Sequence, residues 1–309
     1  MLLYLDDAFS QHDTGSHPEC PQRILLVNQL LRQTGWDKRC ILPEWQAATR
    51  DQLTAVHDAA YYDKLKNWCA MAAGRIESDT VVSRGSWNAA LRAAGAAIDA
   101  TRQVLTGEEK LAFCAIRPPG HHALPSGPMG FCLFNNVAVA AHAALAAGAQ
   151  RVLIVDWDVH HGNGTQDIFY EDGRVAFFSI HRSPFYPGTG SKSETGTGKG
   201  LGWIRNEPVP ADISMRDFSE RFSRGLDAML AKSKPDLILL SAGFDAHRAD
   251  PVGSLCLMED DFRELAQVVR KAADAHAHGR VISLLEGGYH LDHLPTSVVA
   301  HLEGLSQKP

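Results

Sequence analysis

The segment DWDVHHGNG, residues 156–164, contains residue types that can bind a metal ion, and it directly follows an apolar run at 152–155. Alternate residues of an extended strand project to the same side, so Asp158 and His160 can converge on one point. A carboxylate oxygen and an imidazole nitrogen are suitable ligands for a borderline divalent cation such as zinc. The segment therefore predicts part of a metal site whose remaining ligands lie elsewhere in the chain.

A third ligand is expected from Asp245, in the polar segment that follows another apolar run, at 237–240. Three protein ligands and an open position are typical of a catalytic zinc site, whereas structural zinc sites usually have four ligands. The alternative is that Asp158 and His160 only cap turns and hydrogen bond to each other. Asp156 is expected to stand behind the metal ligands and to orient a catalytic histidine.

Two further groups could complete a hydrolytic centre. His121 and His122 lie in a loop after the apolar run at 111–116. Imidazole titrates in the range needed to accept a proton from water and return it to a leaving group. Tyr289 follows two glycines, and its phenol could donate a hydrogen bond to a developing oxyanion. Taken alone, however, the Gly-Gly-Tyr motif favours an ordinary half-buried tyrosine.

These polar segments need elements that bring them together. Apolar runs typical of strands covered on both faces lie at 2–5, 111–116, 152–155, 175–180, 237–240 and 281–285, with weaker candidates at 40–42 and 208–210. Helical patterns lie between them, at 21–33, 86–105, 136–147, 215–232 and 259–277. This alternation predicts one α/β domain over residues 1–309, with a doubly wound, mostly parallel sheet. The candidate residues all follow strands, at the edge where such sheets bind ligands.

Composition narrows the class of protein. The chain has 45% hydrophobic and 21% charged residues, which is ordinary for a globular protein. A net charge of -6 argues against nucleic acid as the main partner. No apolar segment approaches membrane-spanning length, and the acidic N-terminal stretch does not resemble a secretory signal. Six scattered cysteines favour a reduced cytoplasm over a disulfide framework. The oligomeric state stays open.

With these motifs assembled, the chain closely resembles the histone deacetylase family, including its bacterial members, and looks most like the class II side. The resemblance covers nearly all of the sequence. It rests on an N-terminal H-x4-HPExPxR element (12–23), RPPGHHA (117–123), GFCLFNN (130–136), DWDVHHGNGTQ (156–166), SAGFDAHRADP (241–251) and EGGY (286–289). It implies an arginase-like fold with an eight-strand parallel sheet and a zinc-dependent amidohydrolase that removes acyl groups, most simply acetyl, from lysine side chains.

The resemblance also implies roles for individual residues. The implied zinc ligands are Asp158, His160 and Asp245. The implied catalytic residues are the pair His121 and His122, the carbonyl-polarising Tyr289, and Asp156, which would orient His121. The implied substrate-binding residues are Phe131, Tyr186, Gly130 and Gly288. A structural potassium ion is implied at Asp156, Ser179 and Ile180, together with the backbone of Asp158 and His160. Asn163, where class I relatives have Asp, would leave His122 without a carboxylate partner and more readily neutral, and we expect His122 to take the water proton.

Three alternatives to a lysine deacylase stay open. An acetylpolyamine amidohydrolase would share the chemistry, although Val252 stands where some polyamine-directed relatives have an acidic residue. An arginase-like binuclear hydrolase would need a carboxylate at Gly162. A catalytically silent binding module would use the same fold, but none of the motifs is broken. The partner is therefore expected to be an acyl-lysine protein or peptide, or an acylated polyamine.

Overall fold

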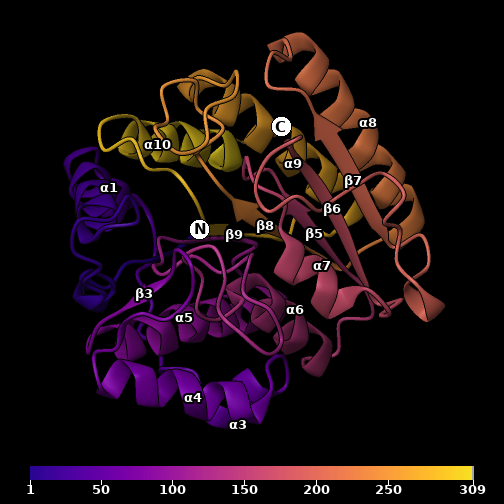
Figure 1. Ribbon diagram of the computed structural model, residues 1–309. Helices are drawn as coiled ribbons and strands as arrows, with labels where there is room; N and C mark the ends of the chain where they lie inside the picture. Colours follow the sequence, from indigo (N-terminus) through magenta and orange to yellow (C-terminus); the bar gives the residue numbers. More distant parts are fainter. Residues whose placement is uncertain (308–309) are drawn as a thin grey trace.

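Seven strands form one parallel sheet at the centre of the molecule (Figure 1). The computed structural model describes residues 1–307. In space the strands are ordered β1-β4-β9-β8-β5-β6-β7, and every neighbouring pair is parallel. Their bounds are β1 Leu2–Tyr4, β4 Leu111–Cys114, β5 Val152–Asp156, β6 Val175–Arg182, β7 Ile204–Val209, β8 Leu237–Ala242 and β9 Val281–Leu285. The parallel α/β sheet expected from the sequence is confirmed.

The expected number of eight strands is wrong for the described residues, because the weak candidate at 40–42 does not form a full strand. Ile41 makes a single parallel bridge with Leu2 beside β1. Its amide donates to Met1 O at 3.0 Å, and its carbonyl accepts from Leu3 N at 2.9 Å. Pro43 follows without an amide hydrogen, so the ladder has no donor there. The second weak candidate, 208–210, overlaps the end of β7.

Helices cover both faces of the sheet (Figure 1). On one face lie α5 (Ser86–Thr106) and α6 (Asn136–Ala146), and on the other lie α8 (Met215–Ser233), α9 (Glu259–His276) and α10 (His293–Ser306). The remaining elements are η1 Asp7–Gln11, α1 Pro21–Gln33, α2 Trp36–Arg39, α3 Arg50–Thr54, α4 Ala59–Ala70, β2 Gly74–Arg75, β3 Val81–Val82, α7 Asn163–Phe169 and η2 Gly198–Gly200. Because both faces are covered, every residue of β5, β8 and β9 is buried.

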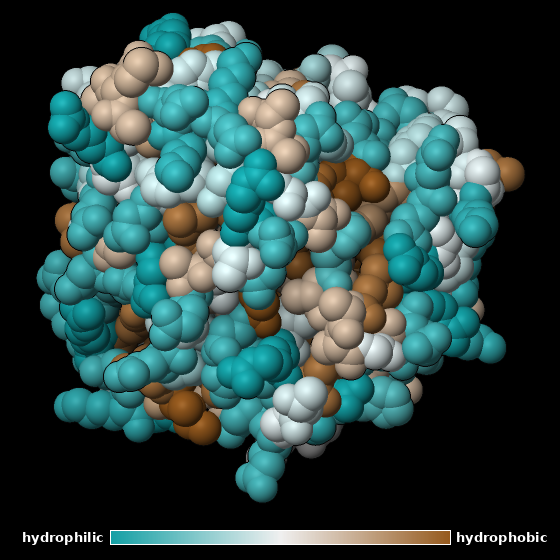
Figure 2. All heavy atoms as spheres, turned by 90° about the horizontal axis from the view of Figure 1, so that it is seen from below, coloured by the Kyte–Doolittle hydropathy of each residue, from teal (hydrophilic) through white to brown (hydrophobic). Residues whose placement is uncertain are grey.

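The face of the molecule seen from below is mainly hydrophilic, and apolar side chains form only scattered patches on it (Figure 2). None of the helices in residues 1–307 is both long and apolar enough to cross a membrane.

The sheet brings the candidate residues to one edge. Strands β8, β5 and β6 are paired in register, with Ser241 beside Asp156 and Asp156 beside Ser179. Ser241 is in turn aligned with Leu284, one residue before the end of β9. The loops that follow these strands therefore leave the sheet at the same level, and they carry the chemistry predicted from the sequence.

Candidate active site

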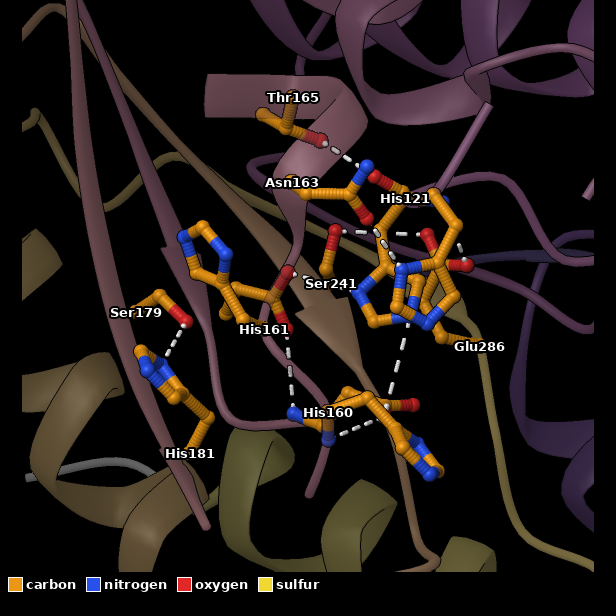
Figure 3. Close-up of polar contacts among 12 residues, drawn as sticks. His121, His160, His161, Asn163, Thr165, Ser179, His181, Ser241 and Glu286 are labelled. Atoms are coloured by element: carbon orange, nitrogen blue, oxygen red, sulfur yellow. Dashed lines mark hydrogen bonds and ion pairs between the residues drawn. The ribbon is translucent and has the colours of Figure 1, made fainter. Parts of the chain in front are cut away.

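Asp158, His160 and Asp245 converge at this edge, and together they are called the metal cradle below. His160 Nδ1 lies 3.0 Å from Asp158 Oδ1 and 3.1 Å from Asp245 Oδ2. All three residues are buried, and His160 is labelled in Figure 3. Two carboxylate oxygens and one imidazole nitrogen aimed at one point form a ligand set that suits zinc with an open coordination position.

Backbone groups fix the orientation of the cradle. Asp245 Oδ1 accepts a hydrogen bond from Val159 N at 2.9 Å, and Asp158 Oδ2 accepts one from Gly287 N at 2.9 Å. A Cβ atom on Gly287 would lie 2.2 Å from Asp245 Oδ2, and one on Gly243 would lie 2.2 Å from Asp158 Oδ2. The two glycines therefore leave the space that the carboxylates occupy.

The electrostatics of the cradle favour a bound cation. Burial and the neighbouring Asp158 raise the pKa of Asp245 to about 7. Burial lowers the pKa of His160, but the hydrogen bonds and charges of Asp158 and Asp245 outweigh it and raise that pKa to about 10. Two adjacent buried carboxylates need compensating positive charge. A divalent ion would supply that charge and would favour the ionised form of Asp245. The residues therefore fit zinc.

The two adjacent histidines have different partners. His121 Nδ1 donates to Asp156 Oδ2 at 2.9 Å, which is the pairing expected for Asp156. His122 Nδ1 lies 2.7 Å from Asn163 Oδ1, and the His121 and His122 rings are 4.0 Å apart between centroids. His121 and Asn163 are labelled in Figure 3. Burial lowers the pKa of His121, but Asp156 and Asp158 outweigh it and raise that pKa to about 10. Burial, His121 and His160 lower the pKa of His122 well below its ordinary value.

The partner of His122 also fixes the position of its proton. Asn163 Oδ1 can only accept, and Asn163 Nδ2 is directed at Met129 Sδ, 3.2 Å away. His122 must therefore carry its proton on Nδ1, which leaves the lone pair on Nε2 free. A neutral imidazole with a free Nε2 is suited to accept a proton.

Glu286 and Arg23 support this centre in ways that the sequence analysis did not predict. Glu286 Oε2 accepts hydrogen bonds from Gly120 N at 2.6 Å and from His121 N at 3.2 Å, and burial raises the pKa of Glu286 to about 7. Arg23 donates to the carbonyls of Glu286 and Gly288, and its guanidinium lies 4.8 Å from the centre of the Tyr289 ring. Both residues lie in motifs that the sequence shows, but their contacts arise only in the fold.

A narrow cavity of about 180 Å³ leads to the cradle. It is lined by Asp79, His122, Gly130, Phe131, His160, Phe185, Tyr186, Val252 and Tyr289. The Phe131 ring packs edge-on against Tyr289 at 5.7 Å, and the Tyr186 ring packs edge-on against His122 at 5.3 Å. The expected channel residues Phe131, Tyr186 and Gly130 are thus brought together with the expected catalytic ones.

Two residues differ from expectation in their placement. Gly288 does not line the cavity, because a side chain there would point to Leu294 and Phe244 on the far side of the loop. Asp79 lines the cavity, although no motif pointed to it. It lies in the turn between β2 and β3, whose two-residue strands are too short to be read from sequence periodicity.

Gly162 bears on the number of metal ions. A Cβ atom on Gly162 would lie 2.2 Å from Asp156 Oδ2 and 3.3 Å from His121 Nδ1. A carboxylate ligand at this position would therefore displace Asp156 from its histidine. This geometry argues against a second metal ion at this position.

The residues expected to hold potassium lie at the ends of β5 and β6. Asp156 is paired in register with Ser179, and Ile180 follows on the same strand. The Ser179 hydroxyl is hydrogen bonded to His181 Nδ1 at 2.9 Å (Figure 3). No contact among the described residues requires an ion there, and potassium stays a prediction.

A second group of possible ligands includes His247, two residues after Asp245. Ligand atoms of His247, Glu259 and His293 lie within 4.8 Å of one another. However, His247 Nδ1 accepts a hydrogen bond from Ala249 N at 3.1 Å, so the neutral ring carries its proton on Nε2, the atom that faces Glu259 at 3.4 Å. Glu259 Oε1 is hydrogen bonded to His293 Nδ1 at 2.7 Å, whereas His247 Nε2 has no hydrogen-bond partner among the described residues. We interpret this group as a polar cluster and not as a metal site.

Comparisons with known proteins agree with this geometry. Residues 17–305 match the histone deacetylase domain family. A probable deacetylase of Archaeoglobus fulgidus is 37% identical over 293 residues, covering 94% of this chain and 81% of the relative. The histone deacetylase-like amidohydrolase of Pseudomonas aeruginosa is 37% identical over 294 residues, covering 94% and 77%. The crystal structure of the HDA15 HD domain matches with a TM-score of 0.93 at 35% identity, covering 98% of this chain and 87% of the other. The chain therefore belongs to the histone deacetylase family.

Proposed function

We propose that this chain is a zinc-dependent amidohydrolase that removes acyl groups, most simply acetyl, from lysine side chains. The observation that carries the proposal is that His160, His122 and Tyr289 face the same narrow cavity. A metal ligand, a neutral base and a hydrogen-bond donor thus surround one reacting position. Relatives named as a probable deacetylase and as an amidohydrolase support hydrolysis of an amide.

Asp158, His160 and Asp245 would hold the zinc ion, which when bound polarises a carbonyl and lowers the pKa of water. His122 Nε2 accepts a proton from the attacking water, because its lone pair is free and its ring is neutral. The Tyr289 hydroxyl donates a hydrogen bond to the carbonyl oxygen as negative charge develops on it. His122 then returns the proton to the departing amine.

The shape of the cavity supports an acyl-lysine substrate. Phe131, Phe185 and Tyr186 are aromatic residues along its length, and they suit the four methylene groups of a lysine side chain. The Phe185 ring also stacks on His160 at 5.1 Å between centroids, so this wall reaches the metal cradle. An extended aliphatic chain would therefore place its acyl end beside the cradle.

An acylated polyamine is the second candidate substrate. Val252 places an apolar side chain in the cavity wall, which favours lysine. Asp79 also lines the cavity, and a carboxylate there would attract the free ammonium groups of a polyamine. The two substrates share every catalytic residue, so the walls of the cavity decide between them.

A panel of acetyl-lysine peptides, longer acyl-lysine peptides and acetylated polyamines tests the proposal. We expect the acetyl-lysine peptides to be hydrolysed with the highest kcat/KM, and a zinc chelator to abolish the activity. Faster turnover of acetylpolyamines would reassign the substrate. Binding of acyl-lysine peptides without any hydrolysis sensitive to hydroxamates would indicate a silent binding module.

We propose two further properties. A potassium ion at Asp156, Ser179 and Ile180 would raise the unfolding temperature in potassium buffer relative to caesium buffer.

The six cysteines are unpaired in the described part of the chain, which supports a reducing compartment such as the cytoplasm.

A further inference from the structure

The buried carboxylate of Asp250 accepts hydrogen bonds from four backbone amides. Its Oδ1 accepts hydrogen bonds from Val252 N and Gly253 N, both at 2.9 Å. Its Oδ2 accepts from Tyr289 N at 2.7 Å and from His290 N at 3.2 Å. Only 5% of the residue is exposed. Hydrogen bonds to an ionised acceptor are stronger than neutral ones, so this carboxylate is a firm anchor.

Two of the four amides belong to residues of the cavity wall. Val252 and Tyr289 both line the cavity, whereas Asp250 itself does not. Gly287 and Gly288 precede Tyr289, and Gly288 has a φ of +123°, a conformation that glycine adopts readily. A segment with two glycines has little conformational preference of its own, so the position of Tyr289 depends on outside contacts.

The anchor itself is fixed to the metal cradle. Ser254 N donates to Asp245 O at 2.9 Å, and a Cβ on Gly253 would lie 2.3 Å from the same carbonyl. Arg182 also donates to Gly253 O at 3.0 Å. Asp250 therefore connects the Tyr289 loop to the turn that packs on Asp245.

We propose that Asp250 is a positioning residue that sets where the Tyr289 hydroxyl meets the reacting carbonyl oxygen. The inference rests on the proposed hydrolysis. Asp250 does not contact the cavity, so it acts through the backbone of residue 289. Small displacements of a catalytic group are costly, since a shift of about 1 Å can lower a rate by roughly a hundredfold.

The substitution Asp250→Asn tests this role. Asn keeps the size of the side chain, but its NH₂ group would face one pair of the backbone amides. Two hydrogen-bond donors would then face each other with no acceptor between them. We expect kcat to fall by about tenfold to a hundredfold, with KM within about threefold and the zinc content unchanged. In a Tyr289→Phe background we expect almost no further loss, because the hydroxyl that Asp250 positions is absent.

Asp236→Asn is the matched control. The Asp236 carboxylate also accepts two backbone amides, from Gln150 at 2.7 Å and Arg151 at 3.0 Å, but it precedes β8 at the opposite end of the strand from the site. We expect this control to leave kcat unchanged. The same loss from Asp250→Asn with and without the Tyr289 hydroxyl would overturn the proposal, as would an unchanged kcat.

Hydrogen exchange of the unsubstituted chain gives an independent test if Asp250→Asn does not fold. We expect the amides of Tyr289 and His290 to exchange as slowly as that of Gly287, which donates to Asp158. Rapid exchange at residues 289 and 290 would overturn the anchor. This measurement needs no substrate, so failure of the proposed hydrolysis and failure of the anchor are distinguishable.

Discussion

The metal cradle and the mouth of the cavity, formed by Asp79, Phe131 and Tyr186, are built in different ways. The cradle residues lie directly beyond β5 and β8 and are buried, and only His160 among them lines the cavity. The mouth residues come from turns between elements and are half-buried or exposed, with Tyr186 exposed by 36%. The sheet thus fixes the chemistry, while loops shape the access to it.

This difference separates the effects expected from substitutions. Buried strand ends have little freedom to relax, so changes in the cradle remove metal or catalysis. Turns on the surface tolerate change, so substitutions at the mouth alter which substrate is preferred. We therefore expect the reaction type and the substrate preference of this chain to be separable.

The largest effect is expected from Asp245→Asn in the cradle. An amide of the same shape is a poor zinc ligand, so zinc content and turnover are lost together, by at least about a thousandfold in kcat. Metal analysis and steady-state kinetics measure both. Asp51→Asn, at an exposed carboxylate on α3, is the control and should change neither. Normal turnover by zinc-free Asp245→Asn would break the distinction between cradle and mouth.

Tyr289→Phe is expected to have the next largest effect. Loss of the hydroxyl removes one donor to the developing oxyanion, which lowers kcat by about a hundredfold to a thousandfold. Zinc content should stay the same, since Tyr289 is not a ligand. Tyr62→Phe removes the hydroxyl of another buried tyrosine, on α4, and should leave turnover unchanged. Loss of zinc from Tyr289→Phe would contradict the assigned role.

Asn163→Asp sharpens the assignment of the base. A carboxylate in place of the amide would stabilise protonated His122 and raise its pKa. The base must be neutral to act, so the acid limb of the kcat/KM profile should move to higher pH, by roughly one unit or more. Asn67→Asp adds the same charge at an exposed position on α4 as the control. An unchanged acid limb would show that His122 is not the base.

Asp79→Asn should have the smallest effect. Losing a partly exposed carboxylate weakens attraction of a cationic substrate, so KM for an acetylated polyamine rises by about two- to fivefold with kcat unchanged. Glu108→Gln removes a charge at an exposed position outside the cavity wall, and should leave KM unchanged. A large loss of kcat in Asp79→Asn would place the mouth within the catalytic machinery.

The elements that support the cradle are largely predictable from the sequence. The five predicted helices correspond to α1, α5, α6, α8 and α9, with ends that differ by at most one residue. The helices are predicted by apolar residues that recur with helical periodicity over long segments. The strand ends are predicted by catalytic residue types that directly follow apolar runs. The short helix α3, the helices α4 and α10 and the β2–β3 hairpin were not predicted.

The missed parts depend on tertiary contacts. Only the end of β7 overlaps a predicted strand, because β7 is an edge strand with Arg205, Asn206 and Glu207 in its centre and its apolar signal is weak. Asp79 reaches the cavity only because a short hairpin folds over it, and Asp250 acquires its four amides only when two distant loops meet. Local sequence patterns do not encode such contacts.

Zinc titration of the metal-free chain, with turnover of an acetyl-lysine peptide as the readout, tests the central claim most directly. We expect activity to be absent without metal and to rise linearly until one equivalent of zinc is bound at the cradle. Full turnover without metal, or no turnover of acyl-lysine or acylpolyamine substrates at any zinc content, would contradict the account.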